Sequence, residues 1–265
     1  MMDAMQIMDV TPEMAAEWLK RNPMNRRIKK EHLAQMVRDM KAGYWQFNGD
    51  AIRFDVDGNL IDGQHRLHSC VRSGVAFKTL VVRGLSSTVR DTIDSGAKRS
   101  NGDRFEMQGV PNGRHVAAMI NQIGTLAFHE PRRVFTPSES DAIYRRHYAQ
   151  IDISVKHANR SGAVPPVWLT SLHFIGCYTG KEPLAEAFVR VFKTGIPSYP
   201  DDPAHLMRER LVRAKMAGNP MSRDWTELSY LMVTTFNNFM RGMSTKALRP
   251  TKSLEIKGWS EKDLW

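Results

Sequence analysis

The stretch 59–68, Asn-Leu-Ile-Asp-Gly-Gln-His-Arg-Leu-His, concentrates residue types that bind anions. Two apolar residues end in an Asp-Gly pair, and a helical pattern begins directly afterwards with Gln64, His65 and Arg66. A strand, a tight turn and a helix N-terminus in this order direct backbone N–H groups and the positive end of the helix dipole toward one point. The three side chains add hydrogen-bond donors to the backbone ones. The pattern therefore predicts a phosphate site.

Metal and thiol chemistry fit the same residues less well. His65, His68 and Cys70 are close in sequence, but no second group of ligands completes a tetrahedral site. Leu67, Cys70 and Val71 are expected on the buried side of the helix, where a thiol is inert. The sequence also lacks a Walker-type loop and a G-x-G-x-x-G pattern. We therefore expect a phosphate to be held by another kind of turn.

Short strands and helices are predicted around this stretch. Alternation over 51–55, the Asp-Gly pair at 57–58 and the apolar residues 59–61 predict a β-hairpin. Residues 77–83 are β-branched and continuous enough for a central strand. The remaining predicted elements are helices: one that begins at Thr11, one over 33–40 that ends at Gly43, and one that follows the Asp-Gly turn and stops at Ser73-Gly74.

The second half of the chain reads as helical. Turn formers gather in 108–113, which we take as the domain boundary. Helices are predicted over 115–128, 137–149, 167–178, 184–193, 204–217 and 225–241. The segment 167–178 is apolar nearly all round, so we expect it to be the central helix.

Composition bounds the function without fixing it. The chain has 265 residues, of which 42% are hydrophobic, so it is long enough to fold around its own core. The net charge of +10 and the pI of about 9.7 favour a polyanionic partner. Residues 111–265 carry 21 Lys and Arg against 14 Asp and Glu, a net of +7. DNA is therefore an expected partner of the second half.

Six basic side chains are the candidates for contact with DNA. They are Arg208, Arg210, Arg213, Lys246, Arg249 and Lys252. The closing segment 241–252 carries four basic residues and no acid, which suits sequence-independent contact with phosphates. Alternatively, these charges solvate a helical domain that covers the nucleotide site.

The redox state and location follow from simpler signals. Cys70 and Cys177 are the only cysteines, which excludes a disulfide framework and fits a reducing compartment. The N-terminus has neither a basic nor an apolar signal region, and no stretch has the length of a membrane span. We expect a cytoplasmic protein that makes no contact with membranes.

Residues 20–110 resemble the N-terminal domain of ParB-like proteins. The likeness rests on five pieces in the same order: Asn22-Pro23 with Arg26 and Arg27, the helix 33–40 closed by Gly43, the strand 52–54, the segment 60–66, and Val81-Val82-Arg83. The resemblance implies an α+β fold of the ParB/sulfiredoxin type, with a small mixed sheet and helices, followed by an all-helical C-terminal domain. The domains would be 1–110, which binds nucleotide, and 111–265, which is basic and helical.

The turn separates branches of that superfamily. Partition proteins carry Gly-Glu-Arg-Arg and bind CTP, sulfiredoxins carry Gly-Cys-His-Arg and use ATP, and related free-serine kinases carry Asp-Gly-His-His-Arg. The turn at 62–66, Asp-Gly-Gln-His-Arg, is nearest to the kinase version. Gln64 replaces the cysteine that sulfiredoxin chemistry needs. Since 111–265 shows no ParB-type helix-turn-helix, the whole chain is most similar to bacteriophage ParB-like proteins.

The resemblance also implies roles for individual residues. Gly63, His65, Arg66 and, by a looser match, Arg99 would hold the phosphates of ATP or CTP, and Arg27 belongs to the matching basic segment. Asp94 would bind the Mg²⁺ that bridges those phosphates. Asp62 would orient the acceptor or the attacking water, with Gln64 and His65 beside it. Two simpler alternatives stay open: Asp62 caps the helix, and 93–102 is an ordinary surface loop.

Three functions are compatible with these residues. The first is an Mg²⁺-dependent NTP hydrolase or phosphotransferase that acts with DNA. The second is a DNA-binding protein that uses nucleotide as a switch. The third is a nuclease in which Asp62 and Asp94 bind metal against a DNA phosphate. Paired acids and a basic surface suit the first and the third equally, so the sequence does not separate them.

Overall fold

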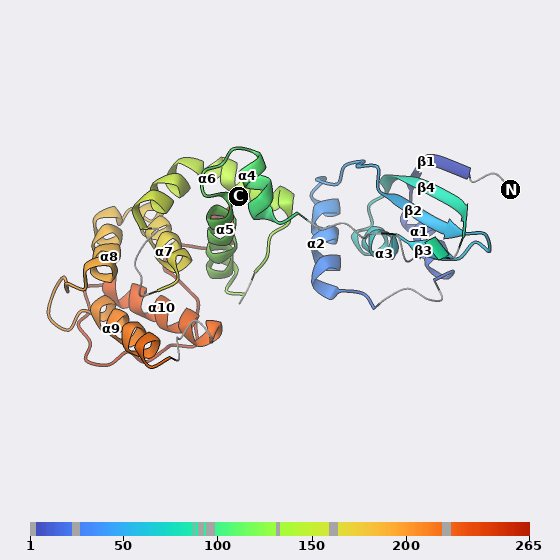
Figure 1. Ribbon diagram of the computed structural model, residues 1–265. Helices are drawn as coiled ribbons and strands as arrows, with labels where there is room; N and C mark the ends of the chain where they lie inside the picture. Colours follow the sequence, from blue (N-terminus) through green and yellow to red (C-terminus); the bar gives the residue numbers. More distant parts are fainter. Residues whose placement is uncertain are drawn as a thin grey trace. The chain divides into compact units, whose positions relative to one another are not determined.

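The computed structural model describes residues 4–22, 27–86, 88–89, 93, 99–130, 133–158, 164–218 and 224–265. The chain forms two compact units, Met1–Lys98 and Arg99–Trp265. The first combines a four-stranded sheet with helices, and the described part of the second is helical apart from one isolated bridge between Ile256 and Trp259. The α+β class is therefore confirmed. Figure 1 labels the elements of both units.

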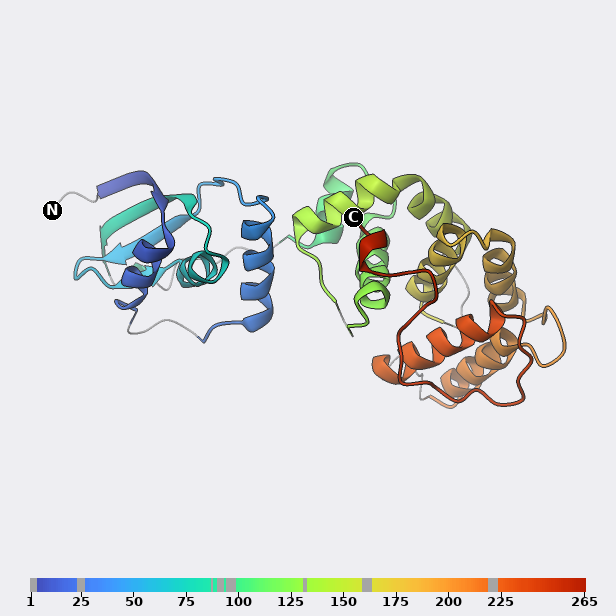
Figure 2. The same ribbon diagram turned by 180° about the vertical axis from the view of Figure 1, so that it is seen from behind.

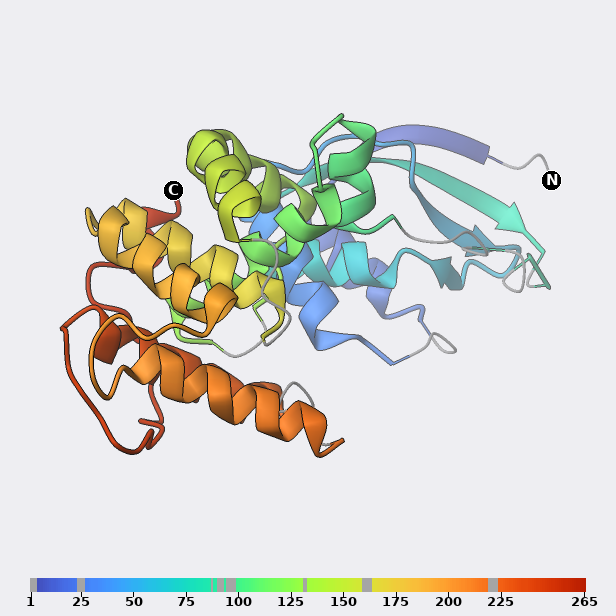
Figure 3. The ribbon, with the colours of Figure 1, turned by 60° about the vertical axis from the view of Figure 1, so that its left-hand side comes forward.

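The sheet of the first unit is mixed and has the strand order β1-β4-β2-β3. Strand β4 (Phe77–Leu85) lies in its interior, antiparallel to β1 (Ala4–Val10) and parallel to β2 (Ala51–Asp55). Strand β3 (Leu60–Asp62) closes the other edge as the antiparallel return of β2. Figure 3 shows β1 running alongside β4. The predicted hairpin and the predicted central strand are both confirmed.

Three helices pack with this sheet around one apolar cluster. They are α1 (Pro12–Leu19), α2 (Lys30–Lys41) and α3 (Gln64–Ser73), and α3 packs against both of the others. The first helix begins as predicted, because the Thr11 hydroxyl accepts a hydrogen bond from the Met14 N–H at 3.3 Å. The fully buried side chain of Phe54 lies at the centre of the cluster.

Two features of this unit were not predicted: strand β1, and the exposure of Val71 in α3. Strand β1 carries apolar residues on both faces, so the alternation that marks a half-buried strand is absent. Val10 is fully buried, whereas Met5 and Ile7 on the opposite face are 71% and 55% exposed. On α3, Cys70 is buried as predicted, but Val71 is 40% exposed, because it lies outside the stripe that faces the sheet.

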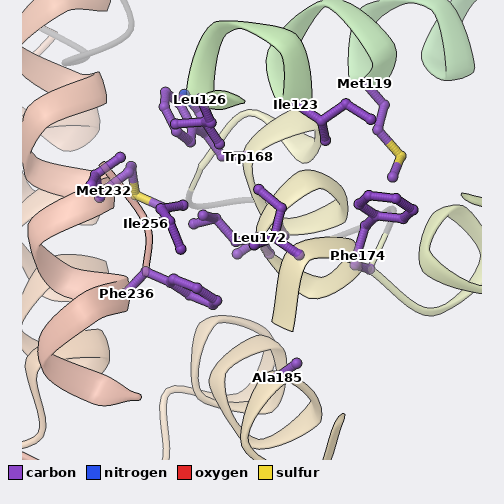
Figure 4. Packing of buried hydrophobic residues seen from close by; sticks show 14 of the residues in the cluster. Met119, Ile123, Leu126, Trp168, Leu172, Phe174, Ala185, Met232, Phe236 and Ile256 are labelled. Atoms are coloured by element: carbon purple, nitrogen blue, oxygen red, sulfur yellow. The ribbon is translucent and has the colours of Figure 1, made fainter. Parts of the chain in front are cut away.

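The second unit consists of seven α-helices in its described residues. They are α4 (Asn101–Met107), α5 (Gly113–Phe128), α6 (Pro137–Ala158), α7 (Pro166–Tyr178), α8 (Glu182–Thr194), α9 (Pro203–Met216) and α10 (Trp225–Phe239). Helix α7 packs against α5, α6 and α8, which confirms it as the central helix. Figure 4 shows Trp168, Leu172 and Phe174 from this helix among the buried side chains of its neighbours.

The C-terminal segment completes this apolar core. The Trp259 indole N–H donates to the backbone carbonyl of Ile123 in α5 at 3.0 Å, and its ring meets Phe174 edge to face. Leu264 is fully buried. Figure 2 shows the end of the chain passing beside α5. Tryptophan with a satisfied N–H contributes a large apolar area, so this segment belongs to the fold of the unit.

The unit boundary differs from the prediction. The compact units separate between Lys98 and Arg99, before the turn at 108–113 that was expected to divide them. That turn instead connects α4 to α5, which pack closely. A methyl group on Gly113 would lie 2.7 Å from the backbone nitrogen of Glu106. Helix α4 begins with a capping box between Ser100 and Asp103, a polar signal that resembles a loop when apolar periodicity alone is considered.

Candidate functional site

The Asp-Gly turn lies between β3 and α3 and needs its glycine. Gly63 has a φ of 101° and precedes the first residue of α3. A Cβ at this position would lie 2.4 Å from Cδ1 of Ile52 and 3.3 Å from its Cα, so the turn packs directly onto strand β2. No side chain caps the N-terminus of α3. The start of α3 therefore has no side-chain cap and follows a glycine turn that packs against β2.

Asp62 is held by groups of its own unit. Its Oδ2 atom accepts hydrogen bonds from Nη1 of Arg53 and, at 3.1 Å, from Nη2 of Arg66. Its Oδ1 atom accepts the N–H of Gly63 at 2.6 Å. Two guanidinium groups neutralise this carboxylate, and every one of its contacts supports the turn. The described geometry therefore favours a structural role for Asp62 over the acceptor-orienting role suggested by the sequence.

Arg66, which the resemblance assigns to the nucleotide phosphates, points into the unit. The side chain is only 11% exposed. Its Nη2 atom donates to the carbonyl of Ala51 at 2.8 Å, and its guanidinium also pairs with Asp62 and, at 3.3 Å, with Asp50. Side chains on a helix lean toward its N-terminus, so position 66 reaches back to the turn four residues earlier. Arg66 is thus a positioning residue for the start of α3.

Gln64 and His65 connect the start of α3 to the segment before α2. Both residues are buried. Oε1 of Gln64 accepts from Nδ2 of Asn22 at 3.4 Å, and Nε2 of His65 accepts from the backbone N–H of Lys29 at 3.2 Å. The His65 ring also lies 5.3 Å from that of His32. Because Nε2 accepts a hydrogen bond, it carries no proton in this arrangement.

Two of the three remaining predicted nucleotide ligands lie within the described residues. Arg27 is exposed and lies two residues before Lys29, next to the segment that binds His65. Arg99 is exposed and begins the second unit. Asp94, the predicted Mg²⁺ ligand, lies outside the described residues. Of the two that the structure describes, Arg27 belongs to the same unit as the turn and Arg99 to the other unit.

Metal and thiol chemistry find no support near the turn. The described residues contain no group of three or more His, Cys, Asp or Glu side chains able to hold a metal ion. Burial raises the pKa of the Cys70 thiol to about 11, and its Sγ contacts the carbonyls of Val10 and Val75. A protonated, enclosed thiol is not a nucleophile, as the sequence predicted. Burial lowers the pKa of His68, and the charge of Arg72 lowers it further.

The six basic candidates of the second unit fall into two groups. Arg208 does not lie on the outside as expected: its side chain is 23% exposed, donates from Nε to the carbonyl of Phe192 at 3.1 Å and pairs with Glu209. Arg210 pairs with Glu227 at 3.1 Å. The other four are exposed and make no ion pair with a described residue: Arg213, Lys246, Arg249 and Lys252. Only this second group keeps its charge available to an external anion.

Sequence reasoning missed Asp50 and Arg53 as partners of the turn. Arg53 faces Asp62 directly across the hairpin in the register of β2 with β3. The hairpin turn at 57–58 predicts that β2 faces β3, but the register shifts between Arg53 and Phe54, so the exact partner of Arg53 did not follow from the sequence. The ion pair from Asp50 to Arg66 joins the start of β2 to α3, and no local pattern indicates it.

No protein-family model, curated protein or solved structure matches this chain. Among the described helices, none combines the length and the apolar character that crossing a membrane requires.

Proposed function

We propose that the first unit is a ParB/sulfiredoxin-like domain that binds the phosphates of a nucleoside triphosphate, ATP or CTP, at the start of α3. One observation carries the proposal: α3 begins without a side-chain cap, directly after a glycine of positive φ that is packed against β2. A helix start of this kind offers backbone N–H donors and the positive end of the helix dipole to an anion. The DGQHR turn has the same position between strand and helix as the phosphate turns of that superfamily.

The charged residues around the turn divide the work. Arg53 and Arg66 neutralise Asp62 and hold the turn, so that a phosphate at the helix start meets no uncompensated carboxylate there. Arg27, exposed and two residues before Lys29, supplies positive charge for the terminal phosphates. Nε2 of His65 accepts the Lys29 N–H, which ties this neighbour of Arg27 to the start of α3.

The place of Mg²⁺ follows from the same contacts. Because Asp62 is engaged by two guanidinium groups, it is not placed to bind a metal ion, and the described residues offer no other ligand cluster. We therefore propose that Mg²⁺ arrives as part of the nucleotide complex and is held mainly by phosphate oxygens. Hydrolysis or phosphoryl transfer is the enzymatic extension of the proposal. The nuclease alternative, which needs Asp62 as a metal ligand, has the least support.

The proposal is tested by calorimetric titration of the full chain with ATP and CTP in the presence of Mg²⁺. One nucleotide should bind, and Arg27→Glu should weaken its binding by about tenfold or more, since it replaces an attractive charge by a repulsive one. Arg72→Glu makes the same charge change in the last turn of α3 and should leave the affinity unchanged. Absence of binding for both nucleotides, or equal losses in the two variants, would overturn the proposal.

A second function is favoured by the four exposed and unpaired basic side chains of the second unit. Arg213, Lys246, Arg249 and Lys252 keep their charge available, whereas Arg208 and Arg210 are paired with acids. Exposed Lys and Arg attract nucleic acid phosphates without reading sequence. We infer that the second unit contacts DNA through these residues. Duplex binding that weakens with salt in the full chain supports this inference, and binding that is absent at low salt contradicts it.

A further inference from the structure

Arg21 and Arg83 lie near the hairpin turn at 57–58, at the end of the β2–β3 hairpin that is away from the Asp62-Gly63 turn. The backbone carbonyl of Arg21 accepts the N–H of Leu60 at 2.7 Å, which fixes the end of α1 beside β3. Its side chain lies over the hairpin turn, because a methyl group on Gly58 would be 3.0 Å from Nη1 of Arg21. The guanidinium of Arg83 lies 4.3 Å from the centre of the Phe54 ring, and Phe54 pairs with Leu60 across the hairpin. The charge of Arg21 also acts on Arg83, so the two guanidinium groups lie on the same part of the surface.

Aromatic rings hold one of these arginines in position. Arg83 lies over Phe54 and 5.2 Å from the centre of the Trp18 ring, and these two rings meet edge to face. A guanidinium stacked on aromatic faces loses little additional freedom when its N–H groups bind a ligand. The residue as a whole remains exposed, so its donors stay accessible.

No acid of the described residues forms an ion pair with Arg21 or Arg83. Burial lowers the pKa of Arg83, and the charge of Arg21 lowers it further. The neighbouring carboxylate of Asp55 accepts the N–H groups of Asp57 and Asn59. Glu17, one turn before Arg21, accepts a hydrogen bond from Lys20 at 2.6 Å, and Lys20 lowers the pKa of Glu17 more than the charge of Arg21 does. Like charges that lie close together without an ion-pair partner are stabilised when an anion binds.

We propose that Arg21 and Arg83 form a second oxyanion site, which takes a phosphate group from a small ligand or from a nucleic acid backbone. Arginine suits this role because its planar fork can bind two phosphate oxygens at once. The site is independent of the nucleotide proposal, since it uses the opposite end of the hairpin and none of the residues at the start of α3. The first unit would then have two separate sites for phosphate groups.

The experiment is a titration of the ¹⁵N-labelled full chain with inorganic phosphate at constant ionic strength, followed by NMR at the arginine Nε–H groups and the Trp18 indole. A saturable shift at Arg83 and Trp18 is expected. Arg21→Gln and Arg83→Gln should each weaken this response by about tenfold, the usual worth of a charge-assisted hydrogen bond. Arg72→Gln removes an exposed charge of the same unit elsewhere and should leave it unchanged.

A parallel titration with oligodeoxythymidine identifies the source of the phosphate. Weakened binding of inorganic phosphate alone in the variants indicates a small ligand, and weakened binding of the oligonucleotide indicates a nucleic acid backbone. Arg21→Gln decides the outcome if Arg83→Gln disturbs folding, because the Arg21 side chain makes no aromatic contact. Unchanged affinity for both ligands in a folded Arg21→Gln protein would overturn the proposal, whatever the amides at the start of α3 report.

Discussion

The two ends of the β2–β3 hairpin use arginine in opposite ways. At the end next to the 62–63 turn, Arg53 and Arg66 form ion pairs with Asp62, and Arg66 also pairs with Asp50. At the hairpin turn, Arg83 lies over the rings of Trp18 and Phe54, and neither Arg21 nor Arg83 makes an ion pair with a described residue. The arginines beside the DGQHR turn therefore stabilise the turn, whereas those at the hairpin turn can bind a ligand. An arginine in a phosphate-type sequence is not by itself a phosphate ligand.

The comparison predicts its largest effect at Arg66. Arg66→Met removes the buried partner of Asp62, Asp50 and the Ala51 carbonyl, and should lower the free energy of unfolding of the first unit by about 3–5 kcal/mol, as breaking a buried ion pair does. Urea denaturation followed by circular dichroism measures this loss. Arg21→Met, at the unpaired end, should change stability by less than about 0.5 kcal/mol. Equal effects at the two ends would break the comparison.

His173 is a buried base that makes no ion pair with a described residue, and in contrast to the exposed arginines it is expected to be uncharged near neutral pH. Burial, with smaller contributions from His157 and Lys193, lowers the pKa of His173 to about 4. The unfolded chain therefore binds a proton near pH 6.5 that the folded chain refuses, so stability is full above that pH and falls as the pH drops toward 4. The second unit should lose about 3 kcal/mol between pH 7 and pH 4.

Thermal unfolding across that pH range checks the His173 prediction. His173→Gln should flatten the dependence, although burial also lowers the pKa values of His115 and His147 and part of the slope should remain. His129→Asn, at an exposed position of positive φ, is the control and should keep the full slope. A slope that persists unchanged in His173→Gln would refute the assignment.

The two hairpin glycines offer a smaller contrast. Both have positive φ, 101° at Gly63 and 78° at Gly58. Alanine at position 63 would strike Ile52, whereas alanine at 58 would meet only the movable end of Arg21. We expect Gly63→Ala to cost about 3 kcal/mol and Gly58→Ala about 1 kcal/mol, within the range for strained backbone positions. Chemical denaturation of both variants measures the difference, and the reverse order would show that the turn does not pack tightly on β2.

The smallest expected effect is on DNA binding by the second unit, where only basic side chains without an ion pair should contribute. Replacing Lys246, Arg249 and Lys252 by Gln should reduce the slope of log affinity for duplex DNA against log salt by about 0.9 for each lost phosphate contact. Arg210→Gln, which removes a side chain paired with Glu227, should leave the slope almost unchanged. Fluorescence anisotropy at several salt concentrations distinguishes the two. A larger change in Arg210→Gln would break the link between free charge and binding.

Much of the fold could be predicted because local signals and tertiary structure agree. Turn chemistry at 57–58 and at Gly74, and the cap at Thr11, fix boundaries within a residue or two. Strand β1 was missed because Met5 and Ile7 leave apolar side chains exposed. Helix α6 extends to Ala158, beyond the predicted end at 149, because no helix-ending residue occurs between the two.

The position of the candidate site in the sequence could be predicted, but the contacts of its side chains could not. A strand, a glycine turn and a helix start follow from the residues at 60–66 alone. The orientation of Arg66 depends on Asp50 and on the Ala51 carbonyl, which only the packing of β2 brings near. The position of Arg83 likewise depends on the rings of Trp18 and Phe54, which belong to separate elements. Residue type predicts the chemistry, whereas tertiary contacts decide which side chain is free to perform it.

We propose that a nucleotide phosphate binds at the start of α3. The most direct test is a titration of the ¹⁵N-labelled full chain with ATP and CTP in Mg²⁺, read at the backbone amides of Gln64, His65 and Arg66. These amides should shift to lower field and saturate together with one of the two nucleotides, since each N–H gains a charged acceptor. Amides at 64–66 that stay unchanged while the nucleotide binds elsewhere, or while neither binds, would contradict the claim.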